Sequence, residues 1–263
     1  MEHLSPVPES VIDALPVLDA NQLGRSIRRH TEMEGLPSLD GIKVAIVGVQ
    51  EDRRAYRNVG CDGAADAIRP YLYQLYKGKW DFGIADLGNL YKGERHTDTL
   101  LLLKEIAQEL LQRQIVLITI GGSQELTYAN YRGYDSLEQT VNIVSVDARL
   151  DVGSEGRELD HQSYVSHLVL QEPHNLYNFT NLGYQTYFNS PEEIALIDKL
   201  FFEAVRLGHI QNQISRTEPF LRDADLVSID LSAVRRAIIQ ELFTHPRTDS
   251  VERIYAPLLA MRA

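Results

Sequence analysis

Cysteine is almost absent, since Cys61 is the single one in 263 residues. One thiol cannot form an internal disulfide, so we expect a buried core to hold the fold. Long apolar runs are also missing, because stretches such as IVLITIGG at 115–122 fall well short of the roughly 20 residues that span a bilayer. The opening MEHLSPVPES lacks the basic and apolar regions of a signal peptide. We therefore expect a cytoplasmic protein without a transmembrane segment.

Basic residues are scarce relative to acidic ones, with 26 Lys and Arg against 37 Asp and Glu, a formal net charge of −11. Such a charge repels phosphate backbones and anionic membrane surfaces, so we expect neither nucleic acid nor membrane as a partner. Apolar residues make up 44% of the chain, enough for a full core. We expect a single domain over 1–263, with an N-terminal arm at 1–40 and C-terminal helices at 237–263.

Short β-branched runs alternate with helical periodicity from Ile42 onward, which is typical of βαβ units. Most of these runs are apolar almost throughout, as strands buried on both faces must be. The pattern predicts an α/β fold, a three-layer α/β/α sandwich around a central, mostly parallel sheet. The expected strands are Ile42–Val49, Ile115–Ile120, Val141–Val146, Phe179–Tyr187 and Leu226–Leu231.

Helices are expected between these strands, with readable ends. One covers 63–76, where Pro70 would kink or split it, and another begins after Thr97 as N-cap. A third begins at Pro191 after the N-cap Ser190 and ends at Gly208. The face of the first helix expected to meet the core comprises Ala64, Ala67, Ile68, Leu72 and Leu75. The basic segment 25–30 is interpreted as a solvated helix face without chemistry, and 234–263 as two helices around the turn at 245–247.

Polar clusters follow three of the expected strands, where ligands bind in open parallel sheets. They are GGSQE at 121–125, DARLD at 147–151 and SIDLS at 228–232. Three aspartates, Asp147, Asp151 and Asp230, should converge on one pocket, and their mutual repulsion calls for a metal, a basic side chain or a shared proton. The alternative is that the aspartates only cap helices or turns, and that Gly121-Gly122 is only a tight turn.

At these clusters the sequence resembles the ureohydrolase family of arginases, agmatinases and formiminoglutamases, whose motifs are GGDH, DAHxD and SxDxD. Supporting similarity includes GVQEDRRAYRNVGCDGAADAIR at 48–69, DLGNL at 86–90, which resembles a DLGD turn, and FTNLGYQTYFNSPEE at 179–193, which is similar to the formiminoglutamase branch. The resemblance covers about residues 42–236. It implies an arginase-like fold, two manganese ions, hydrolysis of a guanidino or formimino C–N bond, and a homo-oligomer.

Carried over residue by residue, the resemblance gives an altered metal site. The first ligand histidine falls on Gln124 and the second on Arg149, while the last aspartate falls on Ser232. The implied first metal would be held by Gln124, Asp147, Asp151 and Asp230, an all-oxygen set that suits one hard ion such as Mg²⁺, Ca²⁺ or Mn²⁺.

The second implied metal would need Arg149, and a guanidinium has no lone pair to donate. We therefore expect one hard divalent ion or none. We further hypothesise that Arg149 lies between Asp147 and Asp230 and supplies the missing charge through fork-like hydrogen bonds. The alternative is an Arg149 at the surface, paired with nothing.

Three functions remain open from the sequence, and the third is a generic α/β binding protein unrelated to the family. The first is a hydrolase of a linear amidine or guanidine, with His161 as the candidate acid or base; His167 is interpreted as structural. The second is a non-catalytic family member with a binding or assembly role, in which Arg149 replaces the second metal. After Arg235 the chain no longer follows the family pattern, which indicates either a shortened or a divergent C-terminus. A sheet without its last strands would have an uncovered edge, which favours self-association.

Overall fold

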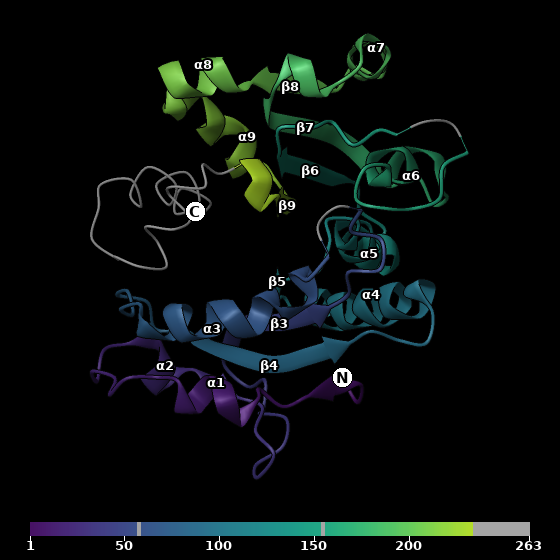
Figure 1. The fold of residues 1–263 in the computed structure, drawn as a ribbon. Coiled ribbons are helices and arrows are strands. Elements are labelled where there is room, and N and C mark those ends of the chain that lie inside the picture. Colours follow the sequence, from purple (N-terminus) through teal and green to yellow (C-terminus); the bar gives the residue numbers. More distant parts are fainter. Residues whose placement is uncertain (57–58, 154–155, 234–263) are drawn as a thin grey trace. The chain divides into compact units, whose positions relative to one another are not determined.

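The computed structural model describes residues 1–56, 59–153 and 156–233 (Figure 1). The chain divides into two compact units, with the boundary between Leu137 and Glu138. Each unit contains its own sheet and helices and is described by itself. The single domain over 1–263 stays a prediction, and the two helices expected at 234–263, which include the C-terminal helices at 237–263, lie outside the described residues.

The first unit is built on a mostly parallel sheet. Its strand order is β1 (Leu4–Ser5), β4 (Gly83–Tyr91), β3 (Ile42–Gln50) and β5 (Val116–Ile120), and β2 (Arg28–Arg29) also pairs with β4. Strand β3 runs parallel to both of its neighbours, and the pairing of β1 with β4 is antiparallel. The apolar side chains of β3 are buried almost without interruption, as the sequence predicts for a strand covered on both faces.

Helices α3 (Ala64–Gln74) and α4 (His96–Gln112) lie beside this sheet (Figure 1). Both expected helices are confirmed, and α3 continues through Pro70 without a break. The start of α4 differs from the prediction, because Arg95 is the N-cap and its backbone N donates to the Asp98 carboxylate at 2.8 Å. The remaining helices of the unit are α1 (Glu9–Asp13), α2 (Leu23–Ser26), α5 (Leu126–Arg132) and the 3-10 helices Cys61–Gly63 and Gly133–Leu137.

The buried face of α3 is not the expected one. Ala65, Arg69 and Tyr73 are buried, whereas Leu75 is 42% exposed. Arg69 turns inward because Asp86 of β4 lies opposite it, with Arg69 Nε 2.8 Å from Asp86 Oδ2. The ion pair of Arg69 and Asp86 therefore determines which face of α3 is buried, and this is not the face that the apolar residues predict.

The second unit contains a parallel sheet in the order β8 (Glu203–Arg206), β7 (Leu176–Tyr184), β6 (Val141–Val146) and β9 (Leu226–Ile229). Its helices are α6 (Tyr164–Leu170), α7 (Pro191–Lys199), α8 (Leu207–Asn212), α9 (Glu218–Arg222) and the 3-10 helices Thr186–Phe188, Ile214–Thr217 and Leu231–Ala233. The predicted cap of α7 is confirmed, since Ser190 Oγ accepts from Glu193 N at 3.1 Å and the Glu193 carboxylate accepts from Ser190 N.

Three expectations about local structure are wrong. Helix α7 ends at Lys199 rather than at Gly208, because Phe201 adopts a left-handed backbone (φ 58°) and the chain then enters β8. DLGNL is part of β4 rather than a turn. Within the segment 25–30, α2 ends at Ser26, and Arg28 and Arg29 form β2 instead of a helix face.

The predicted α/β class with mostly parallel strands is confirmed by these elements. Strands β5 and β9 are each at one end of the strand order of their sheet, and both have exposed apolar side chains. Val116 of β5 is 61% exposed and Ile229 of β9 is 40% exposed. Self-association through such edges stays a prediction. No helix in the described ranges is long and apolar enough to cross a bilayer.

Candidate functional site

The three aspartates come together in the second unit, as predicted. Asp147 follows β6 and Asp230 follows β9, and these strands are paired so that Val146 lies opposite Ile229. The backbone N of Asp230 donates to the carbonyl of Val146 at 3.0 Å, which sets the two strand ends side by side. Asp151 lies in the loop after β6 and is close enough to both to interact electrostatically. The ends of neighbouring parallel strands therefore build this cluster.

Burial and mutual repulsion dominate the electrostatics of the cluster. Asp147 and Asp151 are 1% and 5% exposed. Burial, the charge of Asp147, a hydrogen bond with Asp147 and the charge of Asp230 together raise the pKa of Asp151 well above its usual value. Burial, followed by the charges of Asp151 and Asp147, also raises the pKa of Tyr164, whose hydroxyl lies 3.1 Å from Ser145 Oγ. The carboxyl group of Asp151 therefore retains a proton more readily than an exposed aspartate does.

Asp151→Asn should therefore raise the free energy of unfolding of the metal-free protein by about 1–2 kcal/mol, the usual range for a stabilising substitution. The amide removes a buried charge, can still hydrogen-bond Asp147, and tolerates the left-handed backbone at this residue (φ 48°). Urea denaturation in EDTA measures the change, and the exposed Asp81→Asn should stay within about 0.5 kcal/mol of wild type. A destabilised Asp151→Asn would mean that the carboxylate repulsion is not the dominant cost.

Arg149 does not bridge the aspartates, so the fork-like hypothesis is wrong. Its side chain is exposed, its Nη1 donates to the carbonyl of Phe188 at 2.8 Å, and its Cζ lies 5.1 Å from the centroid of the Phe188 ring. The Phe188 carbonyl and ring offer a hydrogen bond and a cation–π contact that hold the guanidinium there. The alternative of an unpaired Arg149 is equally wrong. Its charge still acts through space, as the smallest of the influences on Asp151, in the direction that lowers the pKa.

A small pocket of about 100 Å³ adjoins the cluster within the same unit. Asp151 and Glu193 contribute carboxylates to its lining, and Arg149 and Arg157 contribute guanidinium groups. Arg157 is neutralised by Asp160, at 2.8 Å between Nε and Oδ2. The remaining lining residues are Gly153, Gln162, Phe188 and Asn189. The volume suits one planar polar group rather than a whole drug-sized molecule.

The residues predicted for the metal do not all fall in one unit. Gln124 is half-buried in the loop after β5 of the first unit, whereas the three aspartates belong to the second. His161 is half-buried in the turn before α6, and its catalytic role stays a prediction. His167 is structural, as interpreted, because Nε2 lies 3.1 Å from the carbonyl of Arg157 and Nδ1 lies 2.8 Å from Gln171 Nε2. The side chain of Ser232 lies outside the described residues.

A second polar cluster, in the first unit, was missed by sequence reasoning. Glu125 is fully buried, and its Oε1 lies 2.6 Å from Ser123 Oγ and 3.0 Å from His96 Nε2. Beside it, burial would raise the pKa of Glu51, but hydrogen bonds from Arg53 and Thr99 hold it below its usual value. Glu125 belongs to the strand-end cluster GGSQE, which was the available signal; His96 carried none.

Cys61 lies near this cluster but is not a nucleophile. Burial, together with the negative charges of Asp52 and Glu125, raises the pKa of its thiol to about 11. The thiol is therefore protonated at neutral pH, and only the thiolate attacks.

The aspartate cluster suits one hard cation by its chemistry. Its donors are carboxylate oxygens, and a divalent ion would relieve the repulsion of Asp151 by Asp147 and Asp230. In the described ranges, however, no three His, Cys, Asp or Glu side chains are already arranged around a common point. Asp147 Oδ1 accepts from the backbone N of Arg149 at 2.8 Å, and Asp151 hydrogen-bonds Asp147. The guanidinium of Arg149 has no lone pair with which to bind a metal ion.

The model of the arginase family matches residues 42–239. The chain belongs to the arginase family. The match begins at β3 and includes all three strand-end clusters, so the fold is that of the family. The resemblance predicted from the motifs is thus confirmed.

Individual relatives point to the formiminoglutamase branch. A formimidoylglutamase of Streptococcus gordonii is 28% identical over 125 residues, 44% of this chain and 38% of that enzyme. One of Lysinibacillus sphaericus is 21% identical over 276 residues, 89% of this chain and 85% of that enzyme. The match to the first relative thus spans well under half of its length, whereas the second is matched along most of its length.

Solved structures share the fold. A formiminoglutamase of Trypanosoma cruzi with Mn²⁺ has a TM-score of 0.63 at 16% identity, covering 74% of this chain and 67% of that one. A formimidoylglutamase of Bacillus subtilis has a TM-score of 0.67 at 16% identity, covering 81% and 70%. At these identities the likeness establishes the fold.

Proposed function

We propose that this chain is a metal-dependent hydrolase that cleaves the C–N bond of a linear amidine or guanidine, like the formimidoylglutamases it resembles. The observation that carries the proposal is the convergence of Asp147, Asp151 and Asp230 at two neighbouring strand ends. The proposed reaction class follows the names of the relatives, and the proposed metal follows the manganese-bound structure of the Trypanosoma cruzi enzyme.

The three aspartates would hold one hard divalent cation, which when bound lowers the pKa of a water molecule and favours its attack on the amidine carbon. The chain's own residues supply orientation. Asp151 and Glu193 line the adjoining pocket and match a cationic amidine group, whereas the exposed Arg149 at its rim matches a substrate carboxylate. Hydrolysis of a formimidoyl group consumes one water and releases formamide and the parent amine.

A non-catalytic role is the second candidate, and the position of Arg149 favours it. The side chain that stands where the family has a ligand histidine is held on Phe188, away from the aspartates. A single cation activates water less than a binuclear centre does. In this alternative the family fold binds a ligand or partner without turnover.

Metal analysis and a product assay separate the two functions. Protein purified with Mn²⁺ should hold about one ion per chain and release formamide from a formimidoyl amino acid, or urea from a guanidine. Asp147→Asn should lose both metal and turnover, whereas the exposed Asp81→Asn should keep both. The double variant Arg149→His and Ser232→Asp restores two family ligands within the second unit, and we expect higher metal uptake and faster turnover. Wild-type protein that retains no metal and forms no product would overturn the hydrolase and favour the non-catalytic role.

A further inference from the structure

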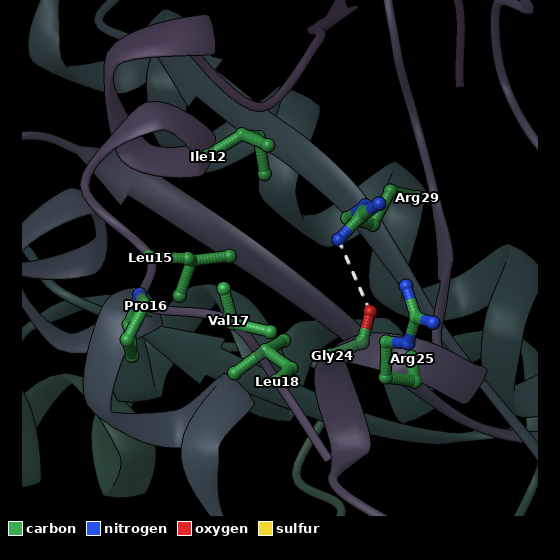
Figure 2. A pocket seen from close by; sticks show the side chains of 8 residues that line it. All are labelled: Ile12, Leu15, Pro16, Val17, Leu18, Gly24, Arg25 and Arg29. Carbon is green, nitrogen blue, oxygen red and sulfur yellow. Dashed lines mark hydrogen bonds between the residues drawn. The ribbon is translucent and has the colours of Figure 1, made fainter. Parts of the chain in front are cut away.

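A cavity lies in the N-terminal segment, away from the motifs. It has a volume of about 360 Å³, within the usual range of small-molecule sites. Figure 2 shows apolar side chains on one side of it and two guanidinium groups on the other. The lining residues are Ile12, Leu15, Pro16, Val17, Leu18, Gly24, Arg25 and Arg29. The sequence interpretation gave this segment no chemistry.

The apolar side of this pocket is fixed by the core of the first unit. Ile12 and Leu15 pack against the buried cluster of Ile27, Ile46 and Tyr73. Val17, in contrast, is fully exposed at the rim and contributes nothing to that core. The pocket thus has a rigid apolar floor that a hydrocarbon chain could cover, removing both surfaces from water.

The cationic side has unused donors. The side chain of Arg25 is exposed and makes no hydrogen bond or ion pair in the described part of the chain. Arg29 donates one Nη1 bond to the carbonyl of Gly24 at 3.2 Å and lies over the Tyr73 ring at 5.8 Å, which holds its guanidinium in place. No carboxylate is among the lining residues to neutralise the pair. Two arginines with free N–H groups favour an anion, and above all a carboxylate.

The pocket is also preorganised, because the segment that carries it is tied to the end of α3. Leu23 N donates to the carbonyl of Leu75 at 2.8 Å, and Gln22 Nε2 donates to the carbonyl of Gln74 at 2.6 Å. Gly24 allows the close approach, since a Cβ there would lie 2.5 Å from Leu18 Cδ1 and 2.9 Å from Tyr73 Cβ. A preformed site avoids part of the entropy cost of binding.

We propose that this pocket binds a small organic anion, a carboxylate with a short apolar tail. The carboxylate would pair with Arg25 and Arg29, and the tail would cover Ile12, Leu15 and Leu18. Charge selects this class of ligand, because the chain as a whole carries −11 and repels anions elsewhere. The site lies outside the strand-end motifs, and its occupancy is independent of the proposed hydrolase activity.

Hexanoate is the probe, and hexan-1-ol is its uncharged match. Titration of the full chain by calorimetry or ligand-observed NMR should give saturable binding of hexanoate and at least tenfold weaker binding of hexan-1-ol. Arg25→Gln should weaken hexanoate binding about tenfold, as expected for a charge-assisted hydrogen bond. Arg28→Gln is the matched control, because Arg28 belongs to the same basic segment, is exposed and does not line the pocket. It should bind hexanoate as wild type does.

A pair of substitutions at Val17 tests the charge without disturbing the fold, since this side chain is fully exposed. Val17→Asp places a carboxylate at the rim and should weaken hexanoate binding at least tenfold, whereas Val17→Asn should change it less than threefold. Three results would overturn the proposal: no saturable binding of hexanoate, equal binding of hexan-1-ol, or equal losses in Arg25→Gln and Arg28→Gln.

Discussion

Arg69→Leu should lower the free energy of unfolding by about 3–5 kcal/mol, the cost of leaving a buried charge without its partner. Arg69 and Asp86 are both fully buried. The guanidinium donates to both Asp86 oxygens, at 2.8 and 2.9 Å, and to Asn89 Oδ1 at 2.6 Å. Leucine fills much of the space but leaves the Asp86 carboxylate in the core with only the Tyr73 hydroxyl and the backbone N of Gly88 as donors.

Urea denaturation followed by circular dichroism measures this loss, and two variants control it. Arg28→Leu removes an exposed arginine of the same unit and should cost less than about 1 kcal/mol. Adding Asp86→Asn to Arg69→Leu removes the stranded charge and should recover part of the stability, since the two sites are in contact. A loss below about 1 kcal/mol in Arg69→Leu would contradict a network that depends on the ion pair.

This network explains two motifs that carry the family resemblance. Arg69 is the last residue of the segment that ends in AIR, and Asp86 is the first residue of DLGNL. The two motifs meet as a buried ion pair between α3 and β4, within the first unit. They are therefore elements of the fold rather than of the candidate active site, and their presence carries no information about catalysis. The aspartates of the second unit carry that information.

Sequence reasoning succeeded where local pattern and structure agree. Strands β3 and β6 are mostly apolar, and the residues Ser190, Pro191 and Glu193 form a recognisable N-terminal cap for α7. The grouping of the aspartates followed from one general property, that the carboxyl ends of parallel strands meet at one edge of a sheet. Each of these predictions needed only residues close in sequence or a rule of topology.

Sequence reasoning failed where a residue distant in the chain determines the position of a side chain. Strand β4 escaped prediction because buried Asp86 and Asn89 interrupt its apolar run, and their partner Arg69 comes earlier in the chain, on α3. Arg149 was expected among carboxylates, but Phe188, farther along the chain at the end of a 3-10 helix, offers its guanidinium a carbonyl and a ring. The direction of a long charged side chain depends on such tertiary contacts, which no local pattern contains.

Gly122→Ala, in the loop after β5, should lower the free energy of unfolding by about 2–5 kcal/mol. Gly122 has a left-handed backbone (φ 74°), which costs an L-residue about 1–2 kcal/mol. A Cβ would also collide with Leu126 Cδ1 and lie 3.0 Å from the carbonyl oxygen of Glu51. Overpacking of this kind typically adds about 1–3 kcal/mol. Gly122 therefore allows this loop to pack closely against the end of β3.

Gly35→Ala separates the two contributions, because Gly35 has nearly the same backbone (φ 70°) but no atom within 4 Å of an added Cβ. It should cost only the backbone strain, about 1–2 kcal/mol. The difference between the variants in urea denaturation measures the packing of the loop. Equal losses would mean that Gly121-Gly122 is a tight turn and nothing more. A larger loss at Gly122 would mean that the loop is held against Glu51, which fixes the backbone that leads to Ser123 and Gln124.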